Sequence, residues 1–199
     1  MRGFGALISI VFVIAVFAVI GGFLIPPDIS FRRFVVIEAP PEQVLAVVTD
    51  THSFPKWLPW VRADRNARYE FTGPEQGTGG GISWSAQDHQ AGGGSVKITS
   101  VSANRIDLKV SFAGRNPASS TFLVEPFQGK TKITWSFSSK VSSINPYTRY
   151  MSLLVPSVIG NEYLRGLANL KSLVEARQPR TNTSQSPSVS PSAAAVAAH

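Results

Sequence analysis

The chain offers few side chains that could carry out acid–base or metal chemistry. Its three histidines, His52, His89 and His199, are spread over the sequence. A metal site needs three or more ligands that converge, so Asp88 with His89 is better explained as a solvated turn in SAQDHQAGGG. The absence of cysteine excludes thiolate catalysis, disulfides and cysteine-based zinc sites. We therefore expect no metal, no other cofactor and no assigned catalytic residue.

Two glycine-rich stretches, GTGGG at 77–81 and AGGGS at 91–95, invite comparison with phosphate-binding loops. Neither has the lysine of a P-loop, and both lead into strand patterns rather than into a helix. Hairpins and bulges explain these glycines better. A Ser–His–Asp triad also lacks support, because no nucleophile-elbow sequence is present.

Aromatic residues are better suited to binding than to catalysis. The stretch FPKWLPW, Phe54 to Trp60, contains two tryptophans and two prolines, and only Lys56 and His52 could supply titratable groups beside it. Its tryptophans could pack in the core, line a cavity rim or lie at a membrane interface. Trp84 and Trp135 lie in strand patterns, where core packing and pocket lining are equally compatible with the sequence.

Alternating apolar and polar residues predict an antiparallel sheet. One strand is expected at 31–39, followed by a short helix at 40–50 that opens with prolines, and a second short helix holds SFPKWLPW, with Ser53 as a possible N-cap and Pro59 as its stop. Six further strand patterns follow in a row, separated by Gly, Pro, Asn or Asp. They cover 67–73, 80–87, 94–102, 105–113, 120–126 and 131–139.

The alternation also assigns the two faces of this sheet. The apolar face holds Ile82, Trp84, Ala86, Val96, Ile98, Ile106, Leu108, Val110, Phe112, Ile133, Trp135 and Phe137. The opposite face holds Lys97, Thr99, Asp107, Lys109, Lys132 and Thr134, and the acids Glu70 and Glu125 also fall on that parity. We therefore predict one dry and one wet face, with no inward carboxylate.

A long helix is expected from Asn145 to about Arg177, with Pro156 kinking or breaking it. Its second part carries apolar residues at three- and four-residue spacing, which predicts one stripe that packs on the sheet. This stripe contains Ile159, Tyr163, Leu167, Leu170 and Val174.

The N-terminal stretch Phe4–Ile25 carries no charged residue. At about 1.5 Å per residue, a helix of this length crosses the roughly 30 Å core of a bilayer. A cleaved signal peptide is the alternative, but the run exceeds a usual signal-peptide core and ends in GGFLIPP rather than in a small-x-small site. We therefore predict an uncleaved, single-pass membrane anchor with its tether over 1–29.

Charge and composition complete the organisation. Arg2 on one side of the anchor and Arg32 with Arg33 on the other do not fix its orientation, and we place the domain outside the cytoplasm as a hypothesis. The net charge of +7 is spread along the chain without a nucleic-acid motif, which favours an anionic membrane surface over nucleic acid. The Ser-, Pro- and Ala-rich segment 178–199 is predicted to be disordered. One globular domain is therefore expected over 30–177.

The order of elements resembles the helix-grip fold of the START-like (SRPBCC) superfamily, an α+β fold in which a curved sheet of about seven strands wraps a long C-terminal helix. VVIEAPPEQVLAVVTD, FPKWLPW, GPEQGTGGGISWS, TKITWSFSS and VIGNEYLRGLANLKSLVEA are similar to segments of its polyketide cyclase/dehydrase and lipid-transport branch. The resemblance covers about residues 31–176. It implies a cavity between sheet and helix that holds lipids, sterols, polyketides or other apolar molecules.

The resulting hypothesis is a membrane-anchored domain that binds a hydrophobic small molecule or lipid. Arg33 is a candidate polar anchor for an anionic group, although its position near a strand start is also compatible with a guanidinium that reaches water. The other candidate binding residues are Trp57, Trp60, Trp84, Val96, Ile98, Leu108, Val110, Phe112, Phe122, Ile133, Trp135, Phe137, Tyr147, Met151 and Tyr163. A cyclase- or dehydrase-like enzyme and an interaction module with a filled cavity remain as alternatives.

Overall fold

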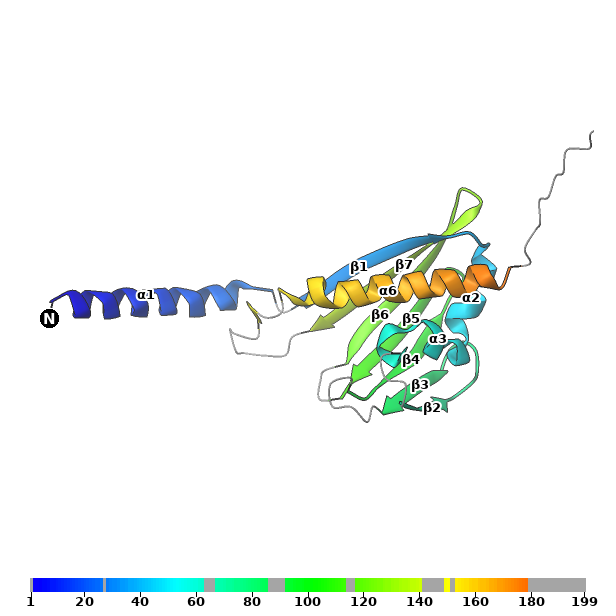
Figure 1. The fold of residues 1–199 in the computed structure, drawn as a ribbon, viewed down its shortest axis with the longest axis horizontal. Helices are drawn as coiled ribbons and strands as arrows, with labels where there is room; N and C mark the ends of the chain where they lie inside the picture. Colours follow the sequence, from blue (N-terminus) through cyan, green and yellow to red (C-terminus); the bar gives the residue numbers. More distant parts are fainter. Residues whose placement is uncertain are drawn as a thin grey trace, which may run out of the picture.

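A computed structural model describes most of the chain. The described residues are 2–26, 28–62, 67–85, 92–113, 117–140, 149–150 and 153–178, with side chains from Ser9 onward except those of Arg62, Val155 and Val158. Figure 1 shows a curved sheet that carries a long helix, with a separate helix projecting from one end.

Seven strands form one antiparallel sheet in the order β1-β7-β6-β5-β4-β3-β2. The strands are β1 (Asp28–Ile37), β2 (Arg68–Thr72), β3 (Gly81–Ser85), β4 (Gly94–Val101), β5 (Arg105–Phe112), β6 (Ala118–Phe127) and β7 (Lys130–Lys140). All seven predicted strands are confirmed. β2 to β7 form a meander in chain order. β1 pairs with β7 and is the edge strand opposite β2.

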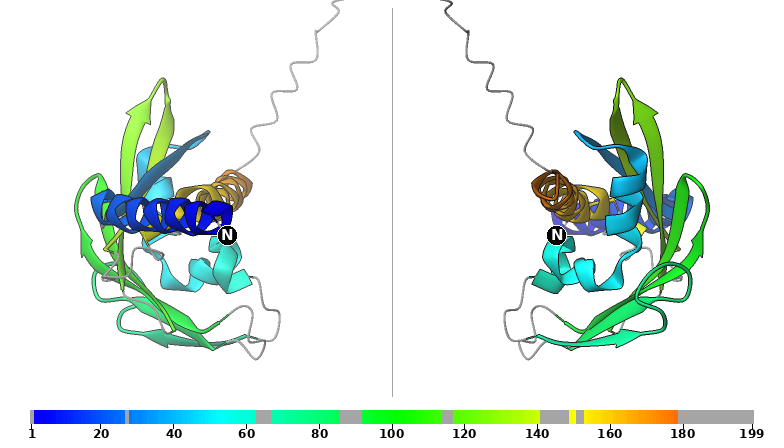
Figure 2. Two further views of the ribbon diagram at one scale, coloured as in Figure 1. Left: turned by 90° about the vertical axis from the view of Figure 1, so that its left-hand side faces the viewer. Right: turned by 90° about the vertical axis from the view of Figure 1, so that its right-hand side faces the viewer.

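The helices lie on the concave side of this sheet, apart from the N-terminal one. They are α1 (Arg2–Leu24), α2 (Pro41–Thr49), α3 (Phe54–Trp57), α4 (Pro59–Arg62) and α6 (Val155–Ala176), with a 3-10 turn η1 (Thr51–Ser53) between α2 and α3. Figure 2 shows the sheet curling around α6 and the short helices. This arrangement confirms the predicted helix-grip architecture, an α+β fold.

Two prolines, Pro59 and Pro156, lie where one helical segment ends and the next begins. Pro59 does follow the end of α3, but it also begins a further turn, α4. Pro156 was expected to kink or break a long helix. Residues 149–150 are helical, 153–154 form a turn, and Pro156 lies in the first turn of a new helix, α6, where a missing N–H costs nothing, which agrees with a break. The expected helix start at Asn145 lies outside the described residues.

The core forms between the apolar sheet face and the predicted stripe of α6. Tyr163, Leu167, Leu170 and Val174 are buried, and Ile159 packs against them. The predicted inward strand residues are buried as well, with Phe112 half-buried and Ala86 outside the described residues. The predicted outward residues are exposed or half-buried. The assignment of one dry and one wet face is therefore confirmed.

The projecting helix α1 presents apolar side chains to its surroundings. Phe12, Phe17 and Leu24 are among its exposed residues, Leu24 at 80% of its full surface. Its last turns are tied to the domain, because Arg149 donates to the carbonyls of Phe23 and Ile25 at 3.1 Å each. Over the described residues, no helix has the length and hydropathy needed to cross a membrane.

Candidate ligand-binding site

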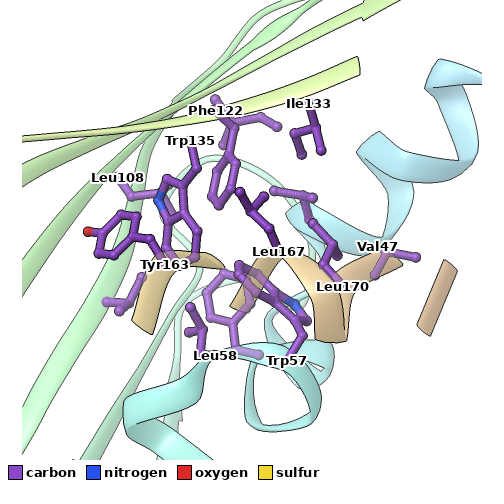
Figure 3. Packing of buried hydrophobic residues seen from close by; sticks show 14 of the residues in the cluster. Val47, Trp57, Leu58, Leu108, Phe122, Ile133, Trp135, Tyr163, Leu167 and Leu170 are labelled. Carbon is purple, nitrogen blue, oxygen red and sulfur yellow. The ribbon is translucent and has the colours of Figure 1, made fainter. Parts of the chain in front are cut away.

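The centre of the core is a group of aromatic rings, the central cluster, made of Trp57, Phe122, Trp135 and Tyr163. The Trp135 ring lies 4.0 Å from Tyr163, 4.8 Å from Phe122 and 5.6 Å from Trp57, centroid to centroid. All four residues are at most 1% exposed. Figure 3 shows these side chains meeting between the sheet, α6 and the short helices. Such contacts fill the middle of the fold with side chains.

Both indoles of the central cluster have hydrogen-bond acceptors within the core. Trp57 Nε1 donates to Ser53 Oγ at 3.2 Å, and Trp135 Nε1 donates to Ser120 Oγ at 2.6 Å. Ser120 Oγ in turn donates to the carbonyl of Ser136 at 3.1 Å. A buried N–H that keeps a partner avoids a desolvation cost of about 1–3 kcal/mol. The hydrogen-bonding capacity of these two indole N–H groups is therefore satisfied within the core.

The sequence did not reveal the two serines that supply these acceptors. Ser53 stands at the N-cap position as predicted, but its side chain makes no capping bond and donates instead to the Val47 and Asp50 carbonyls. Ser120 shares the inward parity of Phe122 on β6, which was the one available signal. A polar residue at an inward position is informative because it needs a buried partner.

Tyr163 is the ionisable side chain of the central cluster. Burial raises the pKa of its phenol well above the ordinary value of 10.0, and a hydrogen bond with Ser120 only partly opposes this shift. The phenol therefore stays protonated at neutral pH. It can donate or accept a hydrogen bond there, but it does not provide a general base.

A second aromatic group, the Phe112 cluster, lies at the β3–β5 side of the core and consists of Trp60, Trp84 and Phe112. Trp60 comes from α4 and lies 5.8 Å from the Phe112 ring, while Trp84 comes from β3 and lies 6.0 Å from it, both edge to face. Trp60 also contacts Trp135 and Tyr163, which joins the two clusters. Trp60 and Phe112 are half-buried, so this cluster reaches closer to the surface.

The indoles of the Phe112 cluster differ from those of the central cluster in one respect. The Nε1 atoms of Trp60 and Trp84 are buried, and neither has a hydrogen-bond partner within the described part of the chain. Buried indole N–H groups usually find an acceptor, so each of these donors calls for an explanation. The candidate site thus combines apolar walls with two unpaired donors.

Gly94 fixes the position of Trp84. A Cβ atom on this glycine would lie 2.8 Å from Trp84 Cη2 and 2.6 Å from the Ser111 carbonyl oxygen. No residue larger than glycine fits there without moving the backbone or the ring. Gly94, the first residue of β4, therefore leaves space for the Trp84 indole.

Arg33 lies on β1 at the opposite end of the core, and its side chain reaches the beginning of α6. Its guanidinium lies over the Phe31 ring at 5.7 Å, donates to the Pro156 carbonyl at 3.4 Å and packs on Gly160. Arg33 is half-buried and thus holds the first turn of α6 against the sheet. Its role toward an anionic ligand stays a prediction.

The outward face of the sheet carries a charged network on β5. Asp107 pairs with Arg105 at 2.8 Å and accepts hydrogen bonds from Thr121 and Ser100. The Arg105 guanidinium, more than the two hydroxyls, lowers the pKa of Asp107 to about 2. A pocket of about 380 Å³ lies beside this network and is lined by residues such as Lys109. Its lining is mixed, with Thr99 and Thr121 beside Leu108 and Ala118.

The remaining candidate residues fall into two groups. Val96, Ile98, Leu108, Val110, Ile133 and Phe137 are buried on the concave face. Tyr147, Met151, Asp88 and His89 lie outside the described residues. His52 is exposed and stacks on Phe71 at 4.2 Å, away from the aromatic core. Among the side chains that are described, no three His, Cys, Asp or Glu residues gather as metal ligands.

Solved structures share this fold at low sequence identity. A protein of unknown function from Staphylococcus aureus is 10% identical with a TM-score of 0.59, and the match covers 75% of this chain and 94% of that one. A Rhodobacter sphaeroides protein is 20% identical with a TM-score of 0.53, covering 77% and 95%. DynU16, from the dynemicin biosynthetic locus, is 16% identical with a TM-score of 0.53, covering 77% of this chain and 49% of that one.

The sequence comparison gives the family. No curated protein matches the sequence significantly. The family model described as "Polyketide cyclase / dehydrase and lipid transport" matches residues 28–175, which span the whole sheet and nearly all of α6. The chain therefore belongs to the polyketide cyclase / dehydrase and lipid transport family of SRPBCC proteins.

Proposed function

We propose that this protein binds a hydrophobic small molecule or lipid between its curved sheet and α6, and that α1 anchors it at a membrane. The family supports a hydrophobic ligand-binding or cyclase-like domain. The observation that carries the binding proposal is the chemistry of the concave face. Within the described residues, that face offers aliphatic and aromatic side chains, a few hydroxyls and a protonated phenol, but no carboxylate or imidazole.

This composition suits retention of an apolar guest better than proton transfer. Burial of apolar surface contributes about 0.8 kcal/mol per methylene without any charged partner. General acid–base catalysis needs a titratable group poised near neutral pH, and the pKa of the Tyr163 phenol is shifted away from that range. The cyclase-like alternative would require an inward acid or base, which would have to come from segments such as 86–91 that contain Asp88 and His89.

The packing of the central cluster leaves the Phe112 cluster as the better region for a bound ligand. Because these four side chains already fill the middle of the core, a ligand fits better at the Phe112 cluster, where Trp60 and Phe112 are only half-buried. The same close packing is the observation that favours the second candidate function, an interaction module with a filled interior.

The membrane part of the proposal rests on α1. Its sequence from Phe4 to Ile25 lacks charges, and its large apolar side chains from Ile10 to Leu24 are exposed. An exposed apolar surface of this extent usually marks contact with lipid or with a partner. The Arg149 bonds to the end of α1 would hold the domain close to the bilayer, where it could take up a lipid.

Native mass spectrometry of the full chain, gently extracted from its membrane, tests the binding proposal. A lipid or other apolar molecule of defined mass should remain bound. Val110→Phe, which fills the concave face, should reduce the bound fraction and the affinity for a fluorescent fatty acid. Lys109→Phe on the outward face of the same strand is the matched control and should leave both unchanged.

The result that would overturn the proposal is a domain that is empty and also fails to bind the fluorescent fatty acid. If Val110→Phe unfolds, Val110→Leu adds less volume at the same buried position and gives a second measurement. Membrane anchoring is tested separately by fractionation of the cells. The full chain should sediment with membranes and resist extraction by high salt, and recovery in the soluble fraction would contradict the anchor.

A further inference from the structure

The indole N–H groups of Trp60 and Trp84 have buried nitrogens and no acceptor within the described chain. We propose that these two groups donate hydrogen bonds to neutral oxygen atoms of the bound molecule. The guest is then an apolar compound that carries carbonyl, ether or hydroxyl oxygens, rather than a plain hydrocarbon chain. This inference rests on the proposed binding function and specifies the polar part of the same site.

The other two tryptophans serve as an internal comparison. Trp57 and Trp135 are buried in the same core, and each donates to a serine hydroxyl. The fold therefore supplies acceptors for its structural indoles, at Ser53 and Ser120. Two donors that are buried on the same core but left unpaired are consistent with an acceptor that arrives with a ligand.

Both donors belong to rings that contact the same side chain, Phe112. Trp60 and Trp84 come from α4 and β3, far apart in sequence, and both rings pack edge to face on Phe112. Gly94 leaves room for the Trp84 ring against the backbone of β4, and Phe112 packs against the same ring. Fixed donors lose little conformational freedom on binding.

The charges on the neighbouring strands favour a neutral acceptor. On β3, β4 and β5 the basic residues are Lys97, Arg105 and Lys109, and all three lie on the outward face. A carboxylate or phosphate buried beside the two indoles would therefore lack a cation within this part of the described sheet. Burying an unpaired charge is far more costly than burying a ketone, ester or alcohol that accepts hydrogen bonds.

The test uses two aromatic probes of similar size, 2-acetylnaphthalene, which carries a carbonyl oxygen, and 2-ethylnaphthalene, which does not. The full chain, labelled with ¹⁵N in its tryptophan indoles and kept in mild detergent, is titrated with each probe. The four indole N–H signals are assigned from single Trp→Phe variants. The acetyl probe should bind about fivefold to tenfold more tightly for each hydrogen bond gained.

With the acetyl probe, a downfield shift should be confined to the indole protons of Trp60 and Trp84, while those of Trp57 and Trp135 keep their positions. Trp60→Phe and Trp84→Phe should each reduce the preference for the acetyl probe. Trp57→Phe, which removes an indole already bonded to Ser53, should keep it. Should one variant fail to fold, the downfield shifts in the unmodified protein still decide the question.

The outcomes separate the two proposals. Equal binding of both probes, with no downfield shift at Trp60 or Trp84, would overturn the donor role and leave apolar binding intact. If neither probe binds and no apolar molecule is found by native mass spectrometry, the binding function fails and the donor role fails with it.

Discussion

The central cluster and the Phe112 cluster are built from the same kinds of side chain but differ in how their polar atoms are paired. In the central cluster, Trp57 and Trp135 are fully buried and donate to serine hydroxyls. In the Phe112 cluster, Trp60 and Trp84 have buried nitrogens without acceptors in the described chain. Both clusters share the concave face and touch through Trp60.

This difference separates stability from binding within one core. A ring whose surface and polar atom are both satisfied contributes mainly to the folded state. A ring with an unpaired donor carries a cost in the free protein that a suitable ligand would remove. We therefore expect substitutions in the central cluster to lower stability, and those in the Phe112 cluster to act more on binding.

The largest effect is expected for Trp135→Ala. This ring is in contact with Trp57, Phe122 and Tyr163, so its removal should lower the free energy of unfolding by about 3–5 kcal/mol. Trp60→Ala, at a half-buried position, should cost clearly less. Urea unfolding of both variants, followed by near-ultraviolet circular dichroism, makes the comparison. Equal losses would show that the two clusters do not differ in their structural role.

Ser120→Ala should convert Trp135 into an indole without an acceptor. The Trp135 N–H loses the 2.6 Å bond and Tyr163 loses its hydroxyl partner, which should lower the free energy of unfolding by about 1–3 kcal/mol. Trp60→Phe removes an N–H that has no hydrogen bond within the described chain, so the free energy of unfolding should fall only by the contribution of the lost packing contacts. The distinction between the clusters fails if Trp60→Phe proves the more damaging change in thermal unfolding.

Two glycines of α6 test how tightly the central cluster is packed. A Cβ at Gly166 would lie 2.7 Å from Trp135 Cζ3 and 3.0 Å from Pro59 Cδ, so Gly166→Ala should destabilise by about 1–2 kcal/mol despite its better helix propensity. At Gly160 the nearest atom is the movable end of Arg33, at 2.5 Å. Gly160→Ala should be neutral or stabilising by up to about 1 kcal/mol. If Gly166→Ala were more stable than the unmodified protein, the side chains around Trp135 would be packed loosely enough to accept a methyl group.

The smallest effect is expected on the outward face of β5. The pKa of Asp107 is lowered from 3.8 to about 2, so its contribution to stability is present above pH 3.8 and is lost as the pH falls through about 2. Because the side chains of Arg105 and Asp107 are 55% and 30% exposed, solvent screens this pair, and Asp107→Asn should cost less than about 1 kcal/mol at pH 7. Unfolding curves of both proteins should converge near pH 2. A difference that persists there would assign the effect to packing instead.

The sequence was sufficient for the architecture because strand and helix periodicity are local properties. The period-two runs correctly placed Leu108 inward and Lys109 outward, and the three- and four-residue spacing correctly placed Tyr163 and Leu167 in the core. Periodicity did not determine where helices begin. Pro156 is compatible with a kink, a break or a first turn, and the structure places it in the first turn of α6.

What the sequence determined by itself is the dry face, the wet face and the family to which they belong. It could not show which of the four tryptophans have a hydrogen-bond acceptor, because the acceptor of an indole N–H can come from a residue that is distant in the chain. Ser120 reaches Trp135 only because β6 pairs with β7, and Trp60 and Trp84 both contact Phe112 only because α4 packs inside the curved sheet. The tertiary structure alone decided which indoles are paired and which are left as donors.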